Sequence, residues 1–445
     1  MADYIDSILA HDPSWGIIGA SLKRPDVRDA LKPQDFLYTL AIASAAGVET
    51  RTIGSILDVL DATTQRADLI ETMCDPRIRI VSLTVTEKGY CHDPATGTLD
   101  RAHPDIVHDL AHPEAPVSAA GLLTRALELR RDRGIAPFTV LSCDNLPANG
   151  KTVRRIVCEF ARLRSAVLAA HIEQAVAFPS SMVDRIVPAT TDADRAEIAR
   201  ITGRDDAWPI MTEPFTQWVI EDHFTAGRPH LGSVGVELVG NVEPFELMKL
   251  RMLNGSHSSL AYLGYLGGYQ YVSEAIADPG LRRLIHGLMT EEAAPTLSIP
   301  LADALSYRDR LLERFANPRL KHRTWQIAMD GTQKLPQRLL GTIRDNIAHG
   351  RSSARLALGV AAWMRYVTGV DETGQAIEVK DPMAPRLLEL ARKIGPNAEA
   401  LAGEFLAIRE VFGDLGKDES FHALVTRKLS DIYAKGALAA AAATA

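Results

Sequence analysis

The sequence has few cysteines and no recognisable spacing of metal ligands. Its 445 residues include four cysteines, and no two of them are close neighbours: Cys74, Cys91, Cys143 and Cys158. This spacing argues against both a disulfide framework and a thiolate zinc site. The thirteen histidines include no His-Glu-x-x-His pattern. We therefore predict a chain from a reducing compartment that holds no metal.

The sequence also lacks an excess of positive charge and a long apolar run. Its net charge of −7 argues against nucleic acid or an anionic membrane surface as the main partner. No apolar run approaches the roughly 18 residues that a membrane-spanning helix needs. The amino terminus has neither the basic start nor the apolar core of a signal peptide. These absences predict a cytoplasmic protein, and they leave its oligomeric state open.

The first half alternates between strand-like and helix-like segments. We expect strands at 15–21, 36–43, 77–85 and 138–142, with helices at 56–73, 118–133 and 151–177. This alternation predicts a parallel sheet with helices on both faces, and ligands bind beyond the carboxyl ends of such strands. Asp26 follows the first strand in a polar loop, where a carboxylate can accept hydrogen bonds from a ribose. An acidic residue in a loop is commonplace, so Asp26 alone is a weak signal.

The second half has helical periodicity throughout. From about residue 243, apolar residues recur at helical spacing in segments that are separated by turn signals such as Asn317-Pro318 and Gly395-Pro396. We therefore predict two domains with a boundary near residues 230–243. Residues 1–237 form an α/β domain and residues 238–445 form an all-helical domain.

The stretch from Glu246 to His257 contains several side chains that can take part in catalysis. On a helix of 3.6 residues per turn, Glu246, Lys249 and His257 fall close to one face, and Asn254 lies beside them. The flanking residues are apolar, so the lysine would be partly desolvated, which favours a neutral amine suited to proton transfer. The alternative is a surface lysine that pairs with Glu246 on an ordinary amphipathic helix.

The spacing of Lys249, Asn254 and His257 resembles the Lys-x-x-x-x-Asn-x-x-His signature of the long-chain mannitol dehydrogenase family of polyol and sugar-acid dehydrogenases. The resemblance extends from about Tyr4 to Ala434 and includes segments 82–90, 142–145 and 182–186. It implies a Rossmann-like dinucleotide-binding domain followed by an all-helical domain. Within the family, segments 248–269 and 322–338 are most similar to fructuronate reductases, also called D-mannonate oxidoreductases.

The resemblance implies metal-free hydride transfer between NAD(H) and a secondary alcohol or ketone. Lys249 would be the general acid in ketone reduction and the base in the reverse direction. Asn145 and Asn254 would hydrogen-bond the developing alkoxide. His257 would position a substrate hydroxyl, and Glu246 would relay the proton to solvent.

Further positions follow from the same resemblance. The residues that would bind the cofactor are Asp26, Thr84, Thr86 and Val183. The residues that would bind the substrate are Asp184, Arg323, Lys334 and Arg338. The last three offer cations for a uronate carboxylate, although solvated basic residues would look the same in sequence. The expected reaction is therefore NAD-dependent reduction of D-fructuronate to D-mannonate, with oxidation of a neutral polyol as the enzymatic alternative.

The sequence departs from the family pattern at its start. The family begins with a strand and a loop of the form Gly-x-Gly-x-Phe-His-Arg-x-His, which is not found here, and residues 1–6 resemble the helix that follows that loop. We expect a first domain without its first strand and glycine-rich loop, either because the true start lies upstream or because cofactor binding is weakened. The second case would describe a non-catalytic protein. Pro25 replaces a frequent acidic residue, and Lys23 and Arg24 would tolerate a phosphate, so the preference for NAD rests on Asp26.

Overall fold

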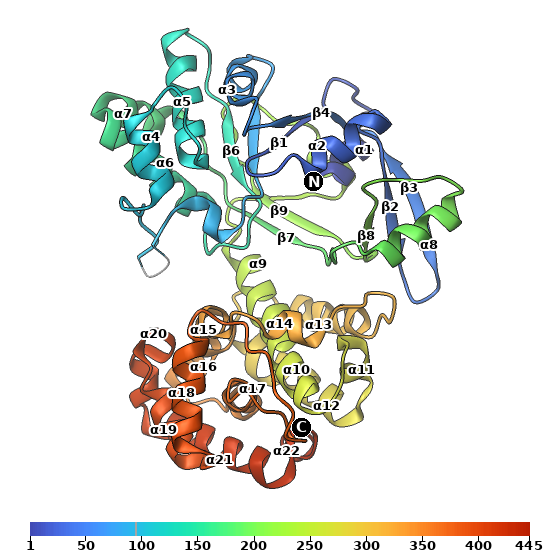
Figure 1. Cartoon of the computed structure of the whole chain (residues 1–445), viewed down its shortest axis with the longest axis vertical. Coiled ribbons are helices and arrows are strands. Elements are labelled where there is room, and N and C mark those ends of the chain that lie inside the picture. The colour runs from blue at the N-terminus through green and yellow to red at the C-terminus, as the bar shows by residue number, and fades with distance from the viewer. Residues whose placement is uncertain (94–95) are drawn as a thin grey trace. The chain divides into compact units, whose positions relative to one another are not determined.

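The computed structural model describes residues 1–93 and 96–445 (Figure 1). It divides into two compact units, Met1–Glu243 and Pro244–Ala445. The first unit combines strands and helices, and the second is helical, as the sequence pattern predicts. None of the described helices has the length and apolar character that a membrane crossing requires.

Short strands of the first unit pair in four small groups within the described residues. β1 pairs with β4, and β5 with β6, both in parallel. β2 pairs with β3 antiparallel and with β8 parallel, while β9 lies between antiparallel β7 and parallel β10. The strand bounds are β1 Ile17–Ser21, β2 Tyr38–Ala43, β3 Val48–Ile53, β4 Ile56–Asp61, β5 Ile80–Leu83, β6 Thr139–Ser142, β7 Ser181–Asp184, β8 Ile210–Thr212, β9 Gln217–Glu221 and β10 Glu237–Val239.

The helices of the first unit pack around a core that includes β5 and β6. Fully buried residues such as Phe138, Val140 and Phe160 join this core, because both faces of β6 are covered. A smaller cluster packs Tyr4 and Ile8 against Trp218. The helices are α1 Ala2–Leu9, α2 Asp26–Leu31, α3 Arg66–Cys74, α4 Pro104–Ala111, α5 Ala119–Asp132, α6 Asn149–Arg164, α7 Ala166–Ala175 and α8 Asp192–Thr202.

The predicted helix at 56–73 is wrong in its first part. Ile56–Asp61 is strand β4, and helix α3 begins only at Arg66. The run contains β-branched residues and finds a parallel partner in β1, so tertiary pairing overrides its helical pattern. Asp61 then ends the strand, because its carboxylate accepts hydrogen bonds from the backbone N–H and hydroxyl of Thr63.

The second unit is built around two helices that are buried on nearly all sides. α10 (Gly255–Leu266) packs against α17 (Ala354–Tyr366), and a Cβ at Gly359 would stand 2.4 Å from the Ser259 hydroxyl oxygen. The remaining α-helices are α9 Glu243–Met248, α11 Val272–Ala277, α12 Pro279–Gly287, α13 Leu301–Phe315, α14 Thr324–Ala328, α15 Gly331–Leu335, α16 Gly341–Ala348, α18 Ala384–Ile394, α19 Ala398–Leu406, α20 Arg409–Phe412, α21 Glu419–Lys435 and α22 Ala437–Thr444.

Three segments of the second unit are π-helical: Lys249–Asn254, Leu288–Ala293 and Pro336–Leu340. The first joins α9 to α10 and the third joins α15 to α16. π-helical turns are rare in proteins, and those that occur are often found at functional sites. Two of the three contain residues of the predicted site, Lys249 and Asn254 in the first and Arg338 in the third.

Candidate functional site

In the first unit, Asp144 ties the carboxyl end of β6 to that of β5. Its carboxylate accepts hydrogen bonds from the backbone N–H of Val85 at 3.0 Å, that of Thr86 at 3.1 Å and the hydroxyl of Tyr90 at 2.6 Å. Because β5 and β6 are parallel with Leu83 opposite Ser142, both loops leave the sheet at the same edge. This edge is where open α/β folds bind ligands.

Asn149 ties the same edge to β7. Its side-chain amide donates to the carbonyl oxygens of Ser142, Asp144 and Ser181, and it accepts from the N–H of Ser181 at 2.9 Å. Asn149 is only 2 % exposed, and its two ends bridge β6 and β7. The loop that carries Asn145 and the strand that carries Asp184 are therefore fixed to each other.

Most of the predicted first-unit residues gather at this edge. Thr84 and Thr86 follow β5 and are exposed, Asn145 follows β6 and is exposed, and Val183 and Asp184 end β7. Thr86 has φ 64° and ψ 167°, a conformation that strongly favours glycine. The hydrogen bond from its N–H to Asp144 holds it there. Asp184 differs from the exposed residues because it is 2 % exposed.

Asp26 lies apart from that group, beyond the carboxyl end of β1. It is the first residue of the short helix α2 rather than a loop residue, which corrects the sequence expectation. Its side chain is 54 % exposed and stands 3.8 Å from Arg24, itself largely exposed. An exposed pair at this distance binds weakly, so the Asp26 carboxylate is accessible to hydroxyl groups.

In the second unit, the stretch from Glu246 to His257 is helical but not one regular α-helix. Glu246 lies in α9, Lys249 and Asn254 bound the π-helical segment, and His257 lies in α10. The N–H of Gly255 bonds the carbonyl of Leu250, five residues earlier. The expected face of 3.6-residue periodicity is therefore wrong in detail, because a π turn rotates the residues before it relative to those after it.

Lys249 is buried, with 9 % of its surface exposed, so it is not the surface lysine of the alternative interpretation. Gly255 lets the site approach a second π-helical segment, since a Cβ there would stand 2.8 Å from the carbonyl oxygen of Arg338. Arg338 in turn donates to the hydroxyl of Ser258 at 3.1 Å. The close contact therefore places the Arg338 guanidinium beside the residue that follows His257.

The His257 ring is buried and contacts two other rings. Phe315 stacks on it with 5.2 Å between ring centroids, and His322 meets it edge-on at 4.7 Å. Burial lowers the pKa of His257 well below its usual 6.5, and the charges of His322, Arg338, Arg314 and Lys334 lower it further. Burial, with a smaller effect of Lys334, lowers the pKa of His322 to about 4. Both imidazoles are therefore neutral near pH 7.

The predicted cations fall into two groups. Lys334 and Arg338 lie close enough to His257 for their charges to lower its pKa. Lys334 also donates to the carbonyl of Met329 at 2.6 Å. Arg323 is exposed, and its guanidinium lies 5.8 Å from the centroid of the Tyr271 ring. A role for Arg323 at the substrate stays a prediction, and the structure places its side chain against Tyr271.

Sequence reasoning missed three residues of these networks: Asp144, Asn149 and His322. Asp144 and His322 stood inside the segments that carry the family resemblance, so their place in the sequence was visible but their contacts were not. Asn149 is the first residue of helix α6, and asparagine is common at the start of a helix, so its sequence position gave no signal. Only the pairing of the strands shows that it joins β6 to β7.

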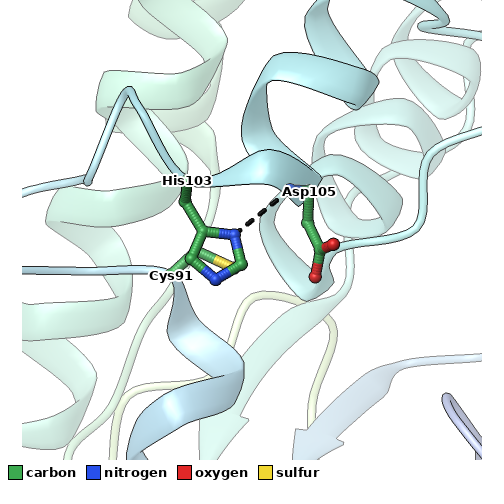
Figure 2. A group of neighbouring side chains, drawn as sticks. All are labelled: Cys91, His103 and Asp105. Atoms are coloured by element: carbon green, nitrogen blue, oxygen red, sulfur yellow. Dashed lines mark hydrogen bonds between the residues drawn. The ribbon is translucent and has the colours of Figure 1, made fainter.

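A separate group in the first unit combines three types of metal ligand. Cys91, His103 and Asp105 place one possible ligand atom each within 4.8 Å of one another. Figure 2 shows the three side chains, and His103 Nδ1 accepts a hydrogen bond from the Asp105 N–H at 3.2 Å. That bond caps α4, and burial together with nearby carboxylates raises the pKa of the Cys91 thiol to about 11. The position of His103 is therefore accounted for by the start of helix α4.

Comparison with known proteins identifies the class of protein. A family model of the mannitol dehydrogenase Rossmann domain matches residues 3–233, and one of the mannitol dehydrogenase C-terminal domain matches residues 241–433. A Rossmann-type domain followed by a helical domain defines a two-domain oxidoreductase. The chain belongs to the mannitol dehydrogenase family, which confirms the resemblance and the predicted fold class.

Individual relatives support the same assignment. The chain is 50% identical to oxidoreductase YeiQ of Escherichia coli (strain K12) over 91% of this chain and 83% of the relative. It is 47% identical to D-mannonate oxidoreductase of the same organism, over 96% and 88% of the two chains. The solved structure of Pseudomonas fluorescens mannitol 2-dehydrogenase, a ternary complex with NAD and D-mannitol, matches with TM-score 0.88 and 39% identity over 99% of this chain and 90% of the other.

The described residues fit parts of a nicotinamide dinucleotide. Asp26 offers an exposed carboxylate for ribose hydroxyls beyond β1, and Thr84 and Thr86 offer exposed polar groups beyond β5. The sequence contains no Gly-x-Gly-x-x-Gly turn for a pyrophosphate.

Proposed function

We propose that this oxidoreductase reduces D-fructuronate to D-mannonate with NADH, reversibly. The observation that carries the proposal is the group of cations beside the buried His257 of a mannitol dehydrogenase family member, which includes Arg314 and the predicted Lys334 and Arg338. A uronate carries a carboxylate, which matches these cations, whereas a neutral polyol does not. The 47% identity to D-mannonate oxidoreductase supports the same substrate.

The proposed chemistry assigns the proton to Lys249. The nicotinamide supplies the hydride that reduces the substrate carbonyl. Lys249 donates a proton to the forming alkoxide oxygen, and in the reverse direction it accepts that proton. Its burial keeps water from competing for the proton. Glu246 lies in α9, three residues before Lys249, and is half-buried. This position suits a carboxylate that passes a proton from solvent to Lys249.

Amide groups stabilise the developing negative charge in this proposal. Asn254 ends the π-helical segment that begins with Lys249, so one rigid turn carries both the proton donor and an amide N–H donor. The family resemblance gives Asn145 of the first unit the same role. Fixed amide donors act where charge appears in the transition state, and they need no reorganisation during the reaction.

The enzymatic alternative is oxidation of a neutral polyol. It is favoured by the likeness to the Pseudomonas fluorescens mannitol 2-dehydrogenase, which was solved with D-mannitol. Arg338→Ala separates the two, because an arginine that pairs with a carboxylate contributes on the order of 2 kcal/mol or more to binding. We expect the Michaelis constant for D-fructuronate to rise about 30-fold or more, and that for D-fructose to change only a few-fold.

The control for this experiment is Arg392→Ala, which removes an exposed arginine of α18. It should leave both Michaelis constants unchanged. Equal effects of Arg338→Ala on the acid and on the neutral sugar would contradict a carboxylate contact. Arg323→Ala, measured in the same way, tests the remaining predicted cation.

A fluorescence titration with NADH tests whether the protein binds the cofactor at all. Binding below millimolar concentration, weakened by Asp26→Ala, is expected if the residues beyond β1 and β5 hold the dinucleotide. No binding at millimolar NADH would instead favour the non-catalytic alternative. The same titration with NADPH decides between the two cofactors.

A further inference from the structure

His257 and His322 form a pair of imidazoles that the family resemblance explains only in part. The pair lies in the second unit, with ring centroids 4.7 Å apart and ring planes at 76°. Phe315 stacks on the His257 ring, with 5.2 Å between ring centroids. His257 belongs to the predicted site, but no role attaches to His322.

Each ring has a nitrogen with no hydrogen-bond partner. Within the residues that the structure describes, His257 Nε2 and His322 Nδ1 are both buried and both without a partner. His257 is 7 % exposed in total. Buried polar atoms are nearly always hydrogen-bonded, because an unsatisfied one costs about 1–3 kcal/mol. Two such atoms on touching rings indicate a place where a ligand supplies the partners.

The backbone fixes the direction of His322. The N–H of Val272 donates to its carbonyl at 3.0 Å, and the N–H of Thr324 donates to the carbonyl of Gln270. Arg323 between them is extended, with φ −80° and ψ 135°, and forms a β-bridge with Tyr271. Successive side chains of an extended segment point to opposite sides. His322 therefore faces His257, whereas Arg323 packs over Tyr271.

The charge state of His322 determines which kind of ligand group it can bind. Its pKa of about 4 leaves the ring neutral, with one nitrogen that donates and one that accepts. A neutral imidazole suits a hydroxyl group, which can donate and accept in turn. A carboxylate is better served by Lys334 and Arg338, which carry full charges.

We propose that His322 binds a hydroxyl group of a polyhydroxy substrate through Nδ1, beside the hydroxyl that His257 binds. This inference rests on the proposed function, because it adds a contact to the same substrate site. Two kinds of side chain then bind the substrate. The cations bind its carboxylate, and the imidazole pair binds its hydroxyl groups. His322, and not the adjacent Arg323, is then the residue of this segment that determines specificity.

The test compares two substitutions of His322. His322→Phe keeps an aromatic ring against His257 but removes Nδ1, whereas His322→Asn places an amide polar atom close to the position of Nδ1. We expect His322→Phe to raise the Michaelis constants for D-fructuronate and D-fructose alike, by about tenfold. The turnover number and the affinity for NADH should stay within a few-fold. His322→Asn should recover most of the loss, and His349→Phe, at an exposed ring of the same unit, should have no effect.

A binding measurement keeps this test separate from the proposed function. The rise in melting temperature on adding D-mannonate, D-mannitol or D-sorbitol is measured for the wild type and for both variants. A polyol that stabilises the wild type but stabilises His322→Phe much less supports the hydroxyl contact, even if D-fructuronate proves not to be the substrate. Equal stabilisation of wild type and His322→Phe overturns the proposal, as does the absence of stabilisation of the wild type by any of the three. A loss confined to D-fructuronate overturns it too, because it would indicate a carboxylate contact.

Discussion

The two units hold their functional polar groups in opposite ways. At the strand edge of the first unit, Asp144 and Asn149 are satisfied by hydrogen bonds within that unit. In the second unit, His257 Nε2 and His322 Nδ1 are buried without such partners. The first arrangement fixes backbone positions, while the second leaves polar atoms for a ligand. Stability and substrate recognition should therefore respond to mutation in different units.

The largest expected effect is on catalysis, in the second unit. Lys249→Ala removes the proposed proton donor, and general acid catalysis contributes roughly 10²–10⁴-fold. We expect the turnover number to fall by about that factor while NADH affinity stays within a few-fold. Steady-state kinetics together with NADH titration measure both quantities. Lys393→Ala, at an exposed lysine of α18, is the matched control. Survival of near-normal turnover in Lys249→Ala would remove the general-acid role.

The next effect is on stability, in the first unit. Asn149→Ala breaks four hydrogen bonds at a residue that is 2 % exposed and leaves backbone groups of β6 and β7 unsatisfied. We expect the free energy of unfolding to fall by on the order of 3 kcal/mol. Urea denaturation measures this change. Asn397→Ala, which removes the single exposed cap of α19, should cost only about 1 kcal/mol. Similar losses for the two variants would mean that Asn149 does not hold the strand edge together.

A third effect links the unpartnered imidazoles to acid stability. His322 has a folded-state pKa of about 4, below its usual 6.5, so its contribution to stability is complete above pH 6.5. As the pH falls from 6.5 towards 4, the unfolded chain takes up a proton that the folded chain resists, and that contribution is lost. The loss between pH 7 and pH 5 should be about 1–2 kcal/mol.

His322→Asn isolates the contribution of His322 to acid stability, because the variant keeps His257 and the nearby charges of Lys334 and Arg338. Urea denaturation at pH 7 and pH 5 should show a smaller loss of stability for the variant than for the wild type. His349→Asn, at an exposed ring, should behave as the wild type. Parallel curves for wild type and His322→Asn would show that the ring titrates normally in the folded protein.

The same contrast explains how far the sequence could predict the site. Strand ends are readable from apolar runs and the polar residues that follow them, so the edge with Thr84, Asn145 and Asp184 was expected. The π turn at Lys249–Asn254 was not, because one extra residue in a turn leaves no mark on the periodicity of so short a segment. The proposed role of His322 could not be predicted from the sequence, because it depends on the pairing of the adjacent Arg323 with Tyr271, a contact between residues 52 positions apart.

The smallest predicted effect concerns the contact between the two π-helical segments. Gly255→Ala would place a Cβ 2.8 Å from the carbonyl oxygen of Arg338, so the two segments must separate slightly. We expect a loss of about 1 kcal/mol in stability and a rise of a few-fold in the Michaelis constant for D-fructuronate, because the guanidinium of Arg338 moves with its backbone. Gly240→Ala is the matched control, since an added Cβ there meets nothing within 4 Å. If Gly255→Ala changes stability but not the Michaelis constant, the close contact serves packing alone, and Arg338 reaches its position without it.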